Sequence, residues 1–312
     1  MDAEQKTRAR DKDAGQAKKT RLPVWLRRPL PRERSFHKTE GLLKALKLST
    51  VCRGAACPNI HECYSSGTAA FLILGPVCTR ACAFCNIQAG EPQAPDPTEP
   101  ERLAQAAARM KLKHVVITSV TRDDLPDGGS AHFAAVIAAL RGALPQSTVE
   151  TLIPDFQGRD SSLQKVLDAA PDIVNHNVET HSSLYPFVRP QADYRRSLDL
   201  LRRVKENGAC AKSGFMVGLG EKDADVLELL HDLKEAGCSI VTIGQYLRPS
   251  KRHPEVKRFV PPETFAEYAR WGHAAGIASV LSAPLARSSY HAEHSLASLQ
   301  GTDLSGKNVA RI

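Results

Sequence analysis

The sequence predicts an α/β protein built around a parallel sheet, and three observations lead to this fold class. From residue 71 onward, short apolar runs alternate with amphipathic stretches of helical length, which is the pattern of repeated βα units. The 312 residues, 42% of them hydrophobic, are enough to fill one barrel-sized core. A doubly wound sheet would fit the same alternation, but the Gly-rich phosphate fingerprint after its first strand is missing. We therefore expect a partial (β/α)6 TIM-like barrel with N-terminal and C-terminal extensions.

Six strand–helix units and a final strand account for the predicted barrel. The strands are expected at the apolar runs Phe71–Leu74, His114–Thr118, Thr148–Ile153, Asp172–Asn175, Ser213–Val217, Ile240–Ile243 and Ile277–Leu281. The helices are expected between them, at Glu101–Leu112, Ala131–Ala143, Ser161–Ala169, Tyr194–Asn207, Ala224–Ala236 and Pro262–Ala275. Asp160 and Asp223 stand where N-caps are needed, and Gly208, Gly237 and Gly276 stand just past helix ends.

Six of the eight cysteines fall within one stretch of 34 residues and form two triplets. The first triplet, Cys52, Cys57 and Cys63, has the spacing C-x4-C-x5-C, and the second, Cys78, Cys82 and Cys85, has the spacing C-x3-C-x2-C. A cubane iron–sulfur cluster takes four ligands, so each triplet would leave one iron without a cysteine. Structural zinc sites usually close with two pairs of Cys or His, and disulfide frameworks belong to small secreted chains. The spacing therefore favours clusters over zinc or structural thiols.

The position of the second triplet indicates a catalytic role. It follows the first predicted strand, Phe71–Leu74, after only a short turn. In parallel α/β barrels, the loops at the C-terminal ends of the strands build the active site. We expect Cys78, Cys82 and Cys85 at that end of the barrel.

The basic charge of the chain is concentrated near its N-terminus. The formal net charge is +8, but residues 1–40 hold 12 Lys or Arg and 6 Asp or Glu, which leaves only +2 for the remaining 272 residues. This distribution favours a solvated leader over a basic nucleic-acid-binding face. No apolar stretch approaches the length of a membrane span. Acidic residues at positions 2, 4, 11 and 13 argue against an organellar transit peptide, so we expect a cytoplasmic protein without a nucleic-acid or membrane partner.

The motifs resemble two nested families. The C-x3-C-x2-C loop after the first strand, with Phe84 in the aromatic position before the third cysteine, resembles the radical S-adenosylmethionine enzymes. The upstream triplet and the R-S-S-Y run at Arg287–Tyr290 narrow this resemblance to the lipoyl synthases. The resemblance runs from about Arg21 to His291 and includes Val116–Gly129, Ile153–Arg159, Asn175–Thr180, Lys212–Glu221 and Gly244–Ser250.

The resemblance implies two 4Fe–4S clusters and S-adenosylmethionine as cofactors. By this resemblance, Cys78, Cys82 and Cys85 hold the cluster that binds S-adenosylmethionine. Cys52, Cys57 and Cys63 hold an auxiliary cluster, and Ser289 is its fourth ligand. The expected catalytic residues are Cys78, Cys82, Cys85 and Ser289. The residues expected to contact S-adenosylmethionine are Phe84, Ser119, Asp123, Glu179, Arg189 and Glu221.

The resemblance also implies a reaction and a set of partners. Sulfur from the auxiliary cluster is placed at C6 and C8 of an octanoyl chain on a lysine of a carrier protein, either a lipoyl domain or the glycine-cleavage H protein. An electron donor and a protein that rebuilds the consumed cluster are implied as well. Unactivated methylene C–H bonds offer no acidic proton and no leaving group, so hydrogen-atom abstraction is the route that remains.

Several alternatives stay open at the level of sequence. The chain could be a sulfur-inserting radical enzyme of the biotin synthase type, or a zinc-stabilised nucleic-acid-binding protein. The Gly-rich loop that ends at Glu221 could be an ordinary tight βα turn. Glu179 and Arg189 could form an ordinary surface ion pair.

We divide the chain into three parts. Residues 1–65 contain the leader and the first triplet, residues 66–285 the barrel, and residues 286–312 the R-S-S-Y run. Residues 1–20 and those after Ala292 match no family motif.

Overall fold

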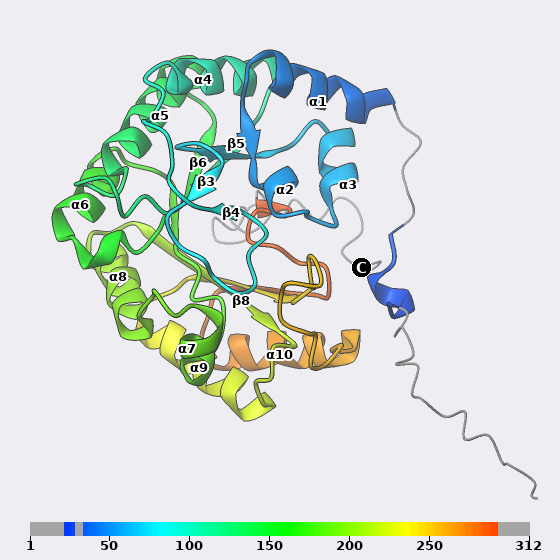
Figure 1. Cartoon of the computed structure of the whole chain (residues 1–312). Helices are drawn as coiled ribbons and strands as arrows, with labels where there is room; N and C mark the ends of the chain where they lie inside the picture. Colours follow the sequence, from blue (N-terminus) through cyan, green and yellow to red (C-terminus); the bar gives the residue numbers. More distant parts are fainter. Residues whose placement is uncertain (1–21, 29–33, 293–312) are drawn as a thin grey trace, which may run out of the picture.

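A curved, mostly parallel sheet with helices along its outer side forms the body of the protein (Figure 1). The computed structural model describes residues 22–28 and 34–292. Eight strands follow the order β1-β2-β5-β6-β7-β8-β9-β10. Seven of them run parallel, and the first edge strand, β1 (Ser49–Thr50), pairs antiparallel with β2. The parallel strands are β2 (Ala70–Ile73), β5 (His114–Ser119), β6 (Thr148–Leu152), β7 (Ile173–Asn175), β8 (Cys210–Val217), β9 (Ile240–Gln245) and β10 (Ser279–Ser282).

The main helices alternate with these strands. They are α4 (Glu99–Met110), α5 (Ser130–Ala143), α6 (Asp160–Asp168), α8 (Tyr194–Glu206), α9 (Asp223–Glu235) and α10 (Pro262–Ala274). Every strand and helix predicted from the apolar pattern is present, with boundaries that agree within three residues. The α/β class with a mostly parallel sheet is therefore confirmed.

The helix-end signals had mixed outcomes. Gly208, Gly237 and Gly276 follow helices with φ values of 79°, 82° and 90°, the left-handed conformation that glycine adopts without strain. The N-cap prediction was wrong: Asp160 and Asp223 are the first residues inside α6 and α9, and Arg159 and Lys222 occupy the cap positions. An acidic residue in the first turn still complements the helix dipole, so the same residue type is favoured one position later.

The segment before β2 contains elements that the periodicity did not predict. After the short helix η1 (Val24–Leu26) come α1 (Arg34–Ala45), β1, α2 (Val51–Gly54) and α3 (Ile60–Ser65). The Thr50 side chain accepts a hydrogen bond from the Arg53 N–H and so begins α2. This segment carries the first cysteine triplet, and β1 fixes it to the edge of the sheet.

The loops at the carboxyl ends of the strands also contain short strands and helices. The β3 (Val77–Cys78) and β4 (Gln88–Ala89) strands form a small parallel pair, and η2 (Phe156–Gly158), η3 (Ser182–Leu184) and α7 (Tyr185–Val188) follow β6 and β7. These loops lie at one end of the sheet, which faces the viewer in Figure 1. We call this end the carboxyl edge.

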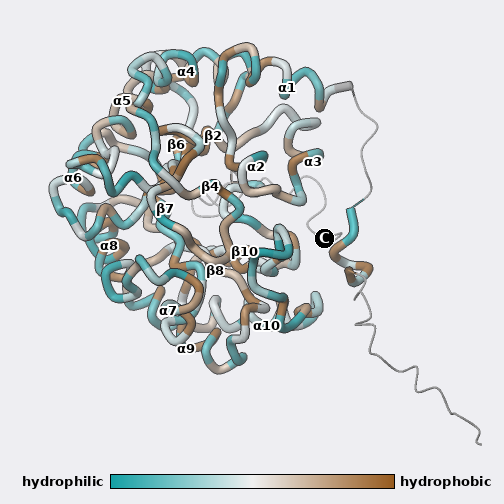
Figure 2. Tube along the Cα trace, viewed as in Figure 1, coloured by the Kyte–Doolittle hydropathy of each residue, from teal (hydrophilic) through white to brown (hydrophobic). Residues whose placement is uncertain are grey.

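Hydrophobic side chains fill the space between the sheet and the helices. One core cluster joins β2, β5 and β6 to α4 and α5, and a second joins β8 and β9 to α9 and α10. Hydrophobic and hydrophilic residues alternate along the outer helices (Figure 2). None of the helices in residues 22–28 and 34–292 combines the length and hydrophobicity that crossing a bilayer requires.

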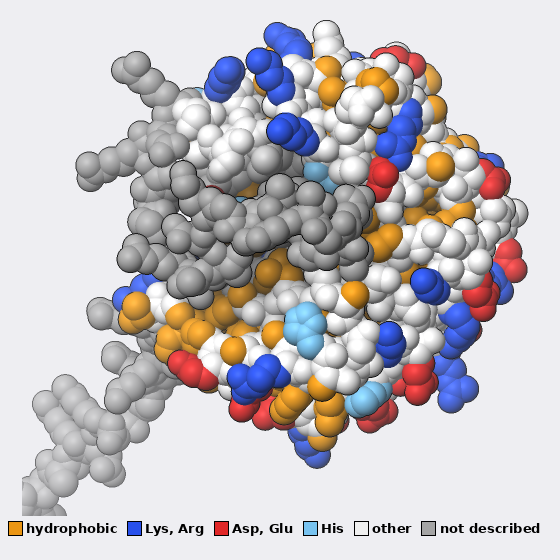
Figure 3. Space-filling view, turned by 180° about the vertical axis from the view of Figure 1, so that it is seen from behind, with side chains coloured by type: hydrophobic (Ala, Val, Ile, Leu, Met, Phe, Trp, Pro, Cys, Tyr) orange, Lys and Arg blue, Asp and Glu red, His pale blue; other side chains and the backbone are white. Residues whose placement is uncertain are grey.

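The face opposite the carboxyl edge carries charges of both signs. Lys and Arg side chains lie around its periphery with Asp and Glu among them (Figure 3). A continuous basic surface of the kind that nucleic-acid binding uses is not seen in the described part of this face. The leader, residues 1–20, and the tail after Ala292 lie outside the described residues.

Candidate active site

The second cysteine triplet lies on the loop that leaves β2 at the carboxyl edge. Leu74 and Gly75 turn the chain with φ values of 67° and 88°, and the chain then runs through β3. Cys78 ends β3, and Cys82 and Cys85 follow before β4. All three thiols are free of disulfide bonds. Sequence reasoning placed the triplet at this end of the sheet, and the structure places it there.

The surroundings of these thiols suit metal ligands. The Cys78 sulfur accepts hydrogen bonds from the backbone N–H groups of Arg80 (3.4 Å) and Thr121 (3.3 Å). Hydrogen bonds to ligand sulfurs are a common feature of protein-bound iron–sulfur clusters. Burial raises the pKa of Cys85 to about 12 and also raises that of Cys82, where the neighbouring Arg189 charge acts in the opposite direction. A coordinated metal would deprotonate such thiols outright.

Arg80, inside the triplet, fastens the loop to the sheet. Its Nε and Nη2 atoms donate to the Asp123 carboxylate at 2.6 and 2.9 Å, and Nη2 also donates to Asp155 at 2.7 Å. Arg196 approaches Asp155 from α8, at 3.2 Å. Burial raises the pKa of Asp155, but the Arg80 hydrogen bond and charge outweigh it and hold that pKa below its usual range. The expected cofactor contact Asp123 therefore has its carboxylate engaged by Arg80.

Glu179 and Arg189 lie beside the triplet without forming a salt bridge to each other. Glu179 adopts φ 67° and is held by backbone hydrogen bonds to β8, through Gly214 and Met216. Burial raises the pKa of Glu179, although the nearby Arg189 charge lowers it. Arg189 stacks over the Tyr185 ring, with its guanidinium carbon 5.4 Å from the centroid. No ion pair joins Glu179 and Arg189 within residues 34–292, so the surface-pair alternative does not describe them.

Two buried polar atoms at this site have no partner in the described chain. They are the Ser119 hydroxyl, at the end of β5, and the Arg189 Nε. A buried polar group without a hydrogen bond is costly, so such groups usually serve a ligand or water. Because Arg189 also lies within electrostatic reach of Cys82, these residues fit a polar ligand with a carboxylate bound next to the triplet.

Two other residues expected to contact the cofactor, Glu221 and Phe84, are engaged with the protein itself. The Glu221 carboxylate accepts from the backbone N–H groups of its own loop, at Gly218 (2.5 Å), Leu219 (3.0 Å) and Gly220 (3.2 Å). This geometry supports the interpretation of the Gly-rich loop as a tight βα turn. Phe84 packs against the apolar cluster that contains Val188, Leu219 and Tyr246, and so anchors the cysteine loop.

The first triplet gathers at the edge of the sheet. Cys52 lies on α2, Cys63 on α3, and Cys57 between them, where its N–H donates to the Cys52 carbonyl (3.0 Å). Burial raises the pKa of Cys52 to about 11 and of Cys63 to about 12, and in both cases neighbouring thiols of the triplet raise it further. The three thiols therefore lie within electrostatic range of one another.

The R-S-S-Y run lies against this triplet although more than 220 residues separate them in the chain. Asn59 donates to the Leu285 carbonyl (2.8 Å), and the Tyr290 hydroxyl donates to Glu62 (2.8 Å), next to Cys63. Arg287 lies within electrostatic reach of Cys57. Among the described residues, the Ser289 hydroxyl has no hydrogen-bond partner. The Ser289 oxygen is therefore available, as expected for the fourth ligand of an auxiliary cluster.

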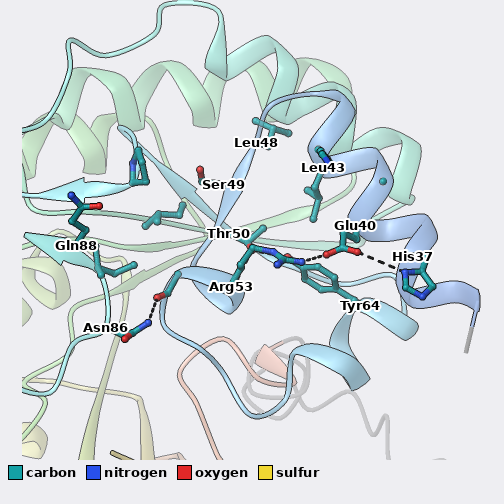
Figure 4. Close-up of a pocket in the computed structure, with 16 residues that line it drawn as sticks. His37, Glu40, Leu43, Leu48, Ser49, Thr50, Arg53, Tyr64, Asn86 and Gln88 are labelled. Carbon is teal, nitrogen blue, oxygen red and sulfur yellow. Dashed lines mark hydrogen bonds and ion pairs between the residues drawn. The ribbon is translucent and has the colours of Figure 1, made fainter. Parts of the chain in front are cut away.

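The two triplets are linked directly. Asn86, the residue after Cys85, donates from its side-chain amide to the Gly54 carbonyl (3.0 Å), two residues after Cys52 (Figure 4). A cavity of about 740 Å³ lies beside this link, lined from α1, β1, α2 and the segment at Asn86–Gln88. Arg53, Glu40 and His37 form a chain of ion pairs along its wall (Figure 4).

A mononuclear metal site is not preformed at either triplet. In residues 22–28 and 34–292, no group of three or more His, Cys, Asp or Glu side chains is drawn together closely enough to hold a metal ion. Ligands of tetrahedral zinc lie about 2.0–2.3 Å from the metal, which demands close packing of the donor atoms.

A buried ion pair behind the R-S-S-Y run was not foreseen. The Lys212 ammonium on β8 contacts both oxygens of Glu150 on β6 (2.8 and 2.9 Å) and donates to the Ser288 carbonyl (2.8 Å). Both side chains are almost fully inaccessible, at 1% and 0%. The sequence did contain a signal for this pair, because Glu150 and Lys212 are charged residues within apolar strands. Buried charges occur mainly where they are paired.

Comparison with known proteins shows the family to which the chain belongs. The family model of the radical SAM superfamily matches residues 72–233. A lipoyl synthase of Nitratidesulfovibrio vulgaris is 62% identical over 273 residues, which are 88% of this chain and 92% of that protein. Lipoyl synthases of Chlorobium chlorochromatii (88% of this chain, 94% of that protein) and Caldanaerobacter subterraneus (90% and 99%) are 54% and 50% identical. The chain belongs to the lipoyl synthase family. It is therefore a radical SAM enzyme, and its cofactors are S-adenosylmethionine and 4Fe–4S clusters.

Solved structures outside the lipoyl synthases share the fold. HydG, a maturase of the FeFe-hydrogenase, matches with a TM-score of 0.56 over 79% of this chain and 63% of that chain, at 14% identity. Streptococcus suis SuiB bound to S-adenosylmethionine matches with a TM-score of 0.52 over 69% and 49%, at 13% identity. At such low identity these matches concern the fold alone. Within this lipoyl synthase, sequence reasoning missed Arg80, Asp155, Glu150 and Lys212, which hold the cysteine loop and the R-S-S-Y run in place.

Proposed function

We propose that the chain converts octanoyl groups into lipoyl groups, by placing sulfur at C6 and C8 of an octanoyl chain on a carrier-protein lysine. The observation that carries the proposal is the position of the R-S-S-Y run beside the first triplet, where it lies near Cys57 and contacts Glu62. The hydrogen bond from Asn86 to Gly54 joins the segments that carry the two triplets. A sulfur source and a radical source are both needed for this reaction, and the arrangement offers one triplet for each. The supporting scaffold is a partial (β/α)6 barrel.

The second triplet is the proposed radical source. Cys78, Cys82 and Cys85 would hold a 4Fe–4S cluster, which together with S-adenosylmethionine supplies a carbon-centred radical able to remove a hydrogen atom from an unactivated C–H bond. The chain's own residues orient and shield this site. Ser119 and Arg189 offer unpaired buried polar atoms to the cofactor, and Glu179 contributes a carboxylate beside them.

The remaining expected contacts have more limited roles in the proposal. Arg80 occupies the Asp123 carboxylate, so Asp123 would act on the cofactor through the position of the loop. Glu221 would shape the Gly-rich turn, and Phe84 would fix the loop by packing.

The first triplet is the proposed sulfur source. Cys52, Cys57 and Cys63 would hold an auxiliary cluster, and Ser289 would supply the fourth ligand. Serine oxygen binds cluster iron more weakly than thiolate does, so Ser289 would be the ligand most easily released from an auxiliary cluster. Each insertion replaces one C–H bond by a C–S bond, and the hydrogen leaves with 5′-deoxyadenosine as one S-adenosylmethionine is consumed.

The reaction fixes the classes of partner. The substrate is an octanoylated lipoyl carrier, either a lipoyl domain or the glycine-cleavage H protein. A one-electron donor must reduce the radical cluster, and a further protein must rebuild the auxiliary cluster. We place the enzyme in the cytoplasm and divide it into residues 1–65, 66–285 and 286–312 as above.

An anaerobic turnover experiment tests the proposal. The reconstituted protein is mixed with S-adenosylmethionine, a strong reductant and an octanoyl-lysine peptide, and both peptide and nucleoside are measured by mass spectrometry. We expect singly and doubly thiolated peptide together with 5′-deoxyadenosine. Formation of 5′-deoxyadenosine without thiolation would refute the sulfur-donor assignment, and absence of both products from a protein with intact clusters would refute the whole proposal.

A further inference from the structure

A three-residue network surrounds the side chain that follows Ser289. Arg28 donates to the Glu62 carboxylate (2.8 Å) and to the Tyr290 hydroxyl (3.1 Å), and the Tyr290 hydroxyl donates to the other Glu62 oxygen (2.8 Å). The Arg28 guanidinium also lies over the Tyr290 ring, 5.9 Å from the centroid. All three contacts in the triangle are therefore made.

The network joins three segments that are far apart in the sequence. Arg28 belongs to the N-terminal segment 22–28, Glu62 lies on α3 immediately before Cys63, and Tyr290 directly follows Ser289. Each member of the triangle other than Arg28 is thus the chain neighbour of an expected ligand of the auxiliary cluster. Moving the Tyr290 side chain would move Ser289 relative to Cys63.

The residue on the other side of Ser289 is anchored as well. The Ser288 carbonyl accepts from the buried Lys212 (2.8 Å), and the Ser288 hydroxyl donates to the Asn177 side chain (2.9 Å). Within the described chain the Ser289 hydroxyl itself has no hydrogen-bond partner. A serine with both neighbours fixed and its own oxygen free is suited to ligate from one set position.

The exposure of the triangle argues against a role in stability alone. The side chains of Arg28 and Glu62 are 32% and 39% exposed, and ion pairs at such positions contribute little to folding. Tyr290, in contrast, is only 5% exposed. The partly exposed pair is therefore better placed to hold a buried residue in position than to hold the fold together.

We propose that Arg28 is a positioning residue: it holds Tyr290 against Glu62 and so keeps the Ser289 oxygen on the iron that no cysteine ligates. The proposal rests on the auxiliary-cluster role given above. The N-terminal segment thereby controls how firmly the fourth ligand is held. Loss of Arg28 removes two of the three contacts of the triangle and so loosens the Tyr290 end of the run, while the Lys212 end stays fixed.

The test measures the auxiliary cluster by itself. In the full chain, Cys78, Cys82 and Cys85 are replaced by Ala so that only the first triplet can hold a cluster, and the protein is reconstituted anaerobically. Iron release to an excess of chelator is followed by absorbance, and Mössbauer spectra report the iron with the non-cysteine ligand. We expect Arg28→Ala to release the first iron about five-fold faster. This is less than the roughly ten-fold or greater change that ligand-supporting residues typically cause, because the Tyr290–Glu62 hydrogen bond remains.

Arg27→Ala is the matched control. Arg27 is the adjacent exposed arginine, and its Nε donates to the Leu22 carbonyl of its own segment (2.8 Å). This variant should release iron at the parent rate. Tyr290→Phe, which keeps the packed ring and removes the hydroxyl, should behave like Arg28→Ala. Equal release rates for Arg28→Ala and Arg27→Ala would overturn the proposal.

A double-variant cycle separates positioning from simple shielding of the cluster. In a Ser289→Ala background the ligand that Arg28 positions is gone, so Arg28→Ala should have no further effect on iron release or on the Mössbauer signature. A five-fold effect that persists there would mean that Arg28 only blocks access by the chelator, and the proposal would be wrong. If the parent protein bound no cluster at the first triplet, the proposed sulfur source itself would fail, and this inference with it.

Discussion

The two cysteine triplets are held in different ways. The loop of the second triplet is fastened by Arg80, which is 4% exposed and pairs with the fully buried Asp155. The first triplet lies on two short helices at the sheet edge. The run beside it is fastened at its Ser288 end by the buried Lys212 and at its Tyr290 end by the partly exposed Arg28 and Glu62. A cluster that must survive many turnovers needs a rigid holder, whereas one that is consumed and rebuilt needs an opening. The exposure of the Arg28–Glu62 pair at the Tyr290 end matches the division of labour proposed for the two triplets.

The largest effects should come from removing one ligand of each triplet. We expect Cys82→Ala to abolish both 5′-deoxyadenosine formation and sulfur insertion, because the cluster that binds S-adenosylmethionine would be lost. Cys57→Ala should keep 5′-deoxyadenosine formation and abolish thiolation. Mass spectrometry of nucleoside and peptide from the same reaction distinguishes the two outcomes.

Cys210→Ala is the control for both variants, since Cys210 begins β8 and belongs to neither triplet. It should leave both products unchanged. If Cys57→Ala also stopped 5′-deoxyadenosine formation, the two triplets would not be separable in function.

Removing Arg80 should have the next largest effect, a loss of unfolding free energy. Arg80→Ala leaves the buried Asp155 carboxylate with Arg196 as its one remaining ion-pair partner, and breaking a buried pair typically costs about 3–5 kcal/mol of unfolding free energy. Urea unfolding at pH 7, monitored by circular dichroism, measures this loss. Arg196→Ala, which removes the outer partner of Asp155 at 3.2 Å, should cost much less because its side chain is 36% exposed.

The pH dependence of this loss has a definite sign. In the parent protein the Asp155 pKa is held below its unfolded value, so the ionised form stabilises the fold at neutral pH and that contribution disappears as the pH falls below about 4. Arg80→Ala removes the hydrogen bond and the charge that lower this pKa most, so the variant has less of this stabilisation to lose. The difference between variant and parent should therefore stay constant between about pH 7 and pH 5 and shrink as the pH falls below about 4, and a constant difference down to about pH 3 would contradict the assignment.

Exchanging the fourth ligand sharpens the comparison between a permanent and a consumable cluster. Ser289→Cys offers a thiolate, which binds iron more tightly than a serine oxygen. We expect both clusters to form and 5′-deoxyadenosine to appear, with sulfur insertion slowed by about ten-fold or more, a change of about 1.4 kcal/mol in the barrier. Single-turnover formation of the doubly thiolated peptide is the measurement. Insertion at the parent rate would exclude a sacrificial role for the Ser289–iron bond.

The parts of this architecture that the sequence predicted are those encoded locally. Apolar runs such as Ile240–Ile243 and the spacing of Cys78, Cys82 and Cys85 depend on neighbours only a few residues away. The anchors depend on residues far apart: Arg80 meets Asp155 across 75 positions, and Lys212 meets Ser288 across 76. Nothing in one sequence pairs such residues, although Lys212, a charge inside an apolar strand, is recognisable as a residue that needs a partner.

Glu221 and Asp123 show a second limit of the same kind. Both are acidic residues in loops after strands, and the resemblance assigned both to the cofactor. The structure gives the Glu221 carboxylate to three N–H groups of its own turn and the Asp123 carboxylate to Arg80. Whether a loop carboxylate faces a ligand or its own backbone depends on side-chain direction, which sequence spacing does not fix.

The smallest expected effect concerns the leader, which lies outside the described residues. Residues 1–40 carry an excess of 6 positive charges, but residues 1–20 hold 6 Lys or Arg and 4 Asp or Glu, so deleting them removes an excess of only 2. If the leader helps to dock an acidic carrier, the deletion should weaken carrier binding by about two-fold at low salt and not measurably at 0.15 M salt, where surface charges are screened within about 8 Å. Calorimetric titration with the octanoylated carrier at both salt concentrations measures this. An unchanged affinity at low salt would place docking on the folded part of the chain.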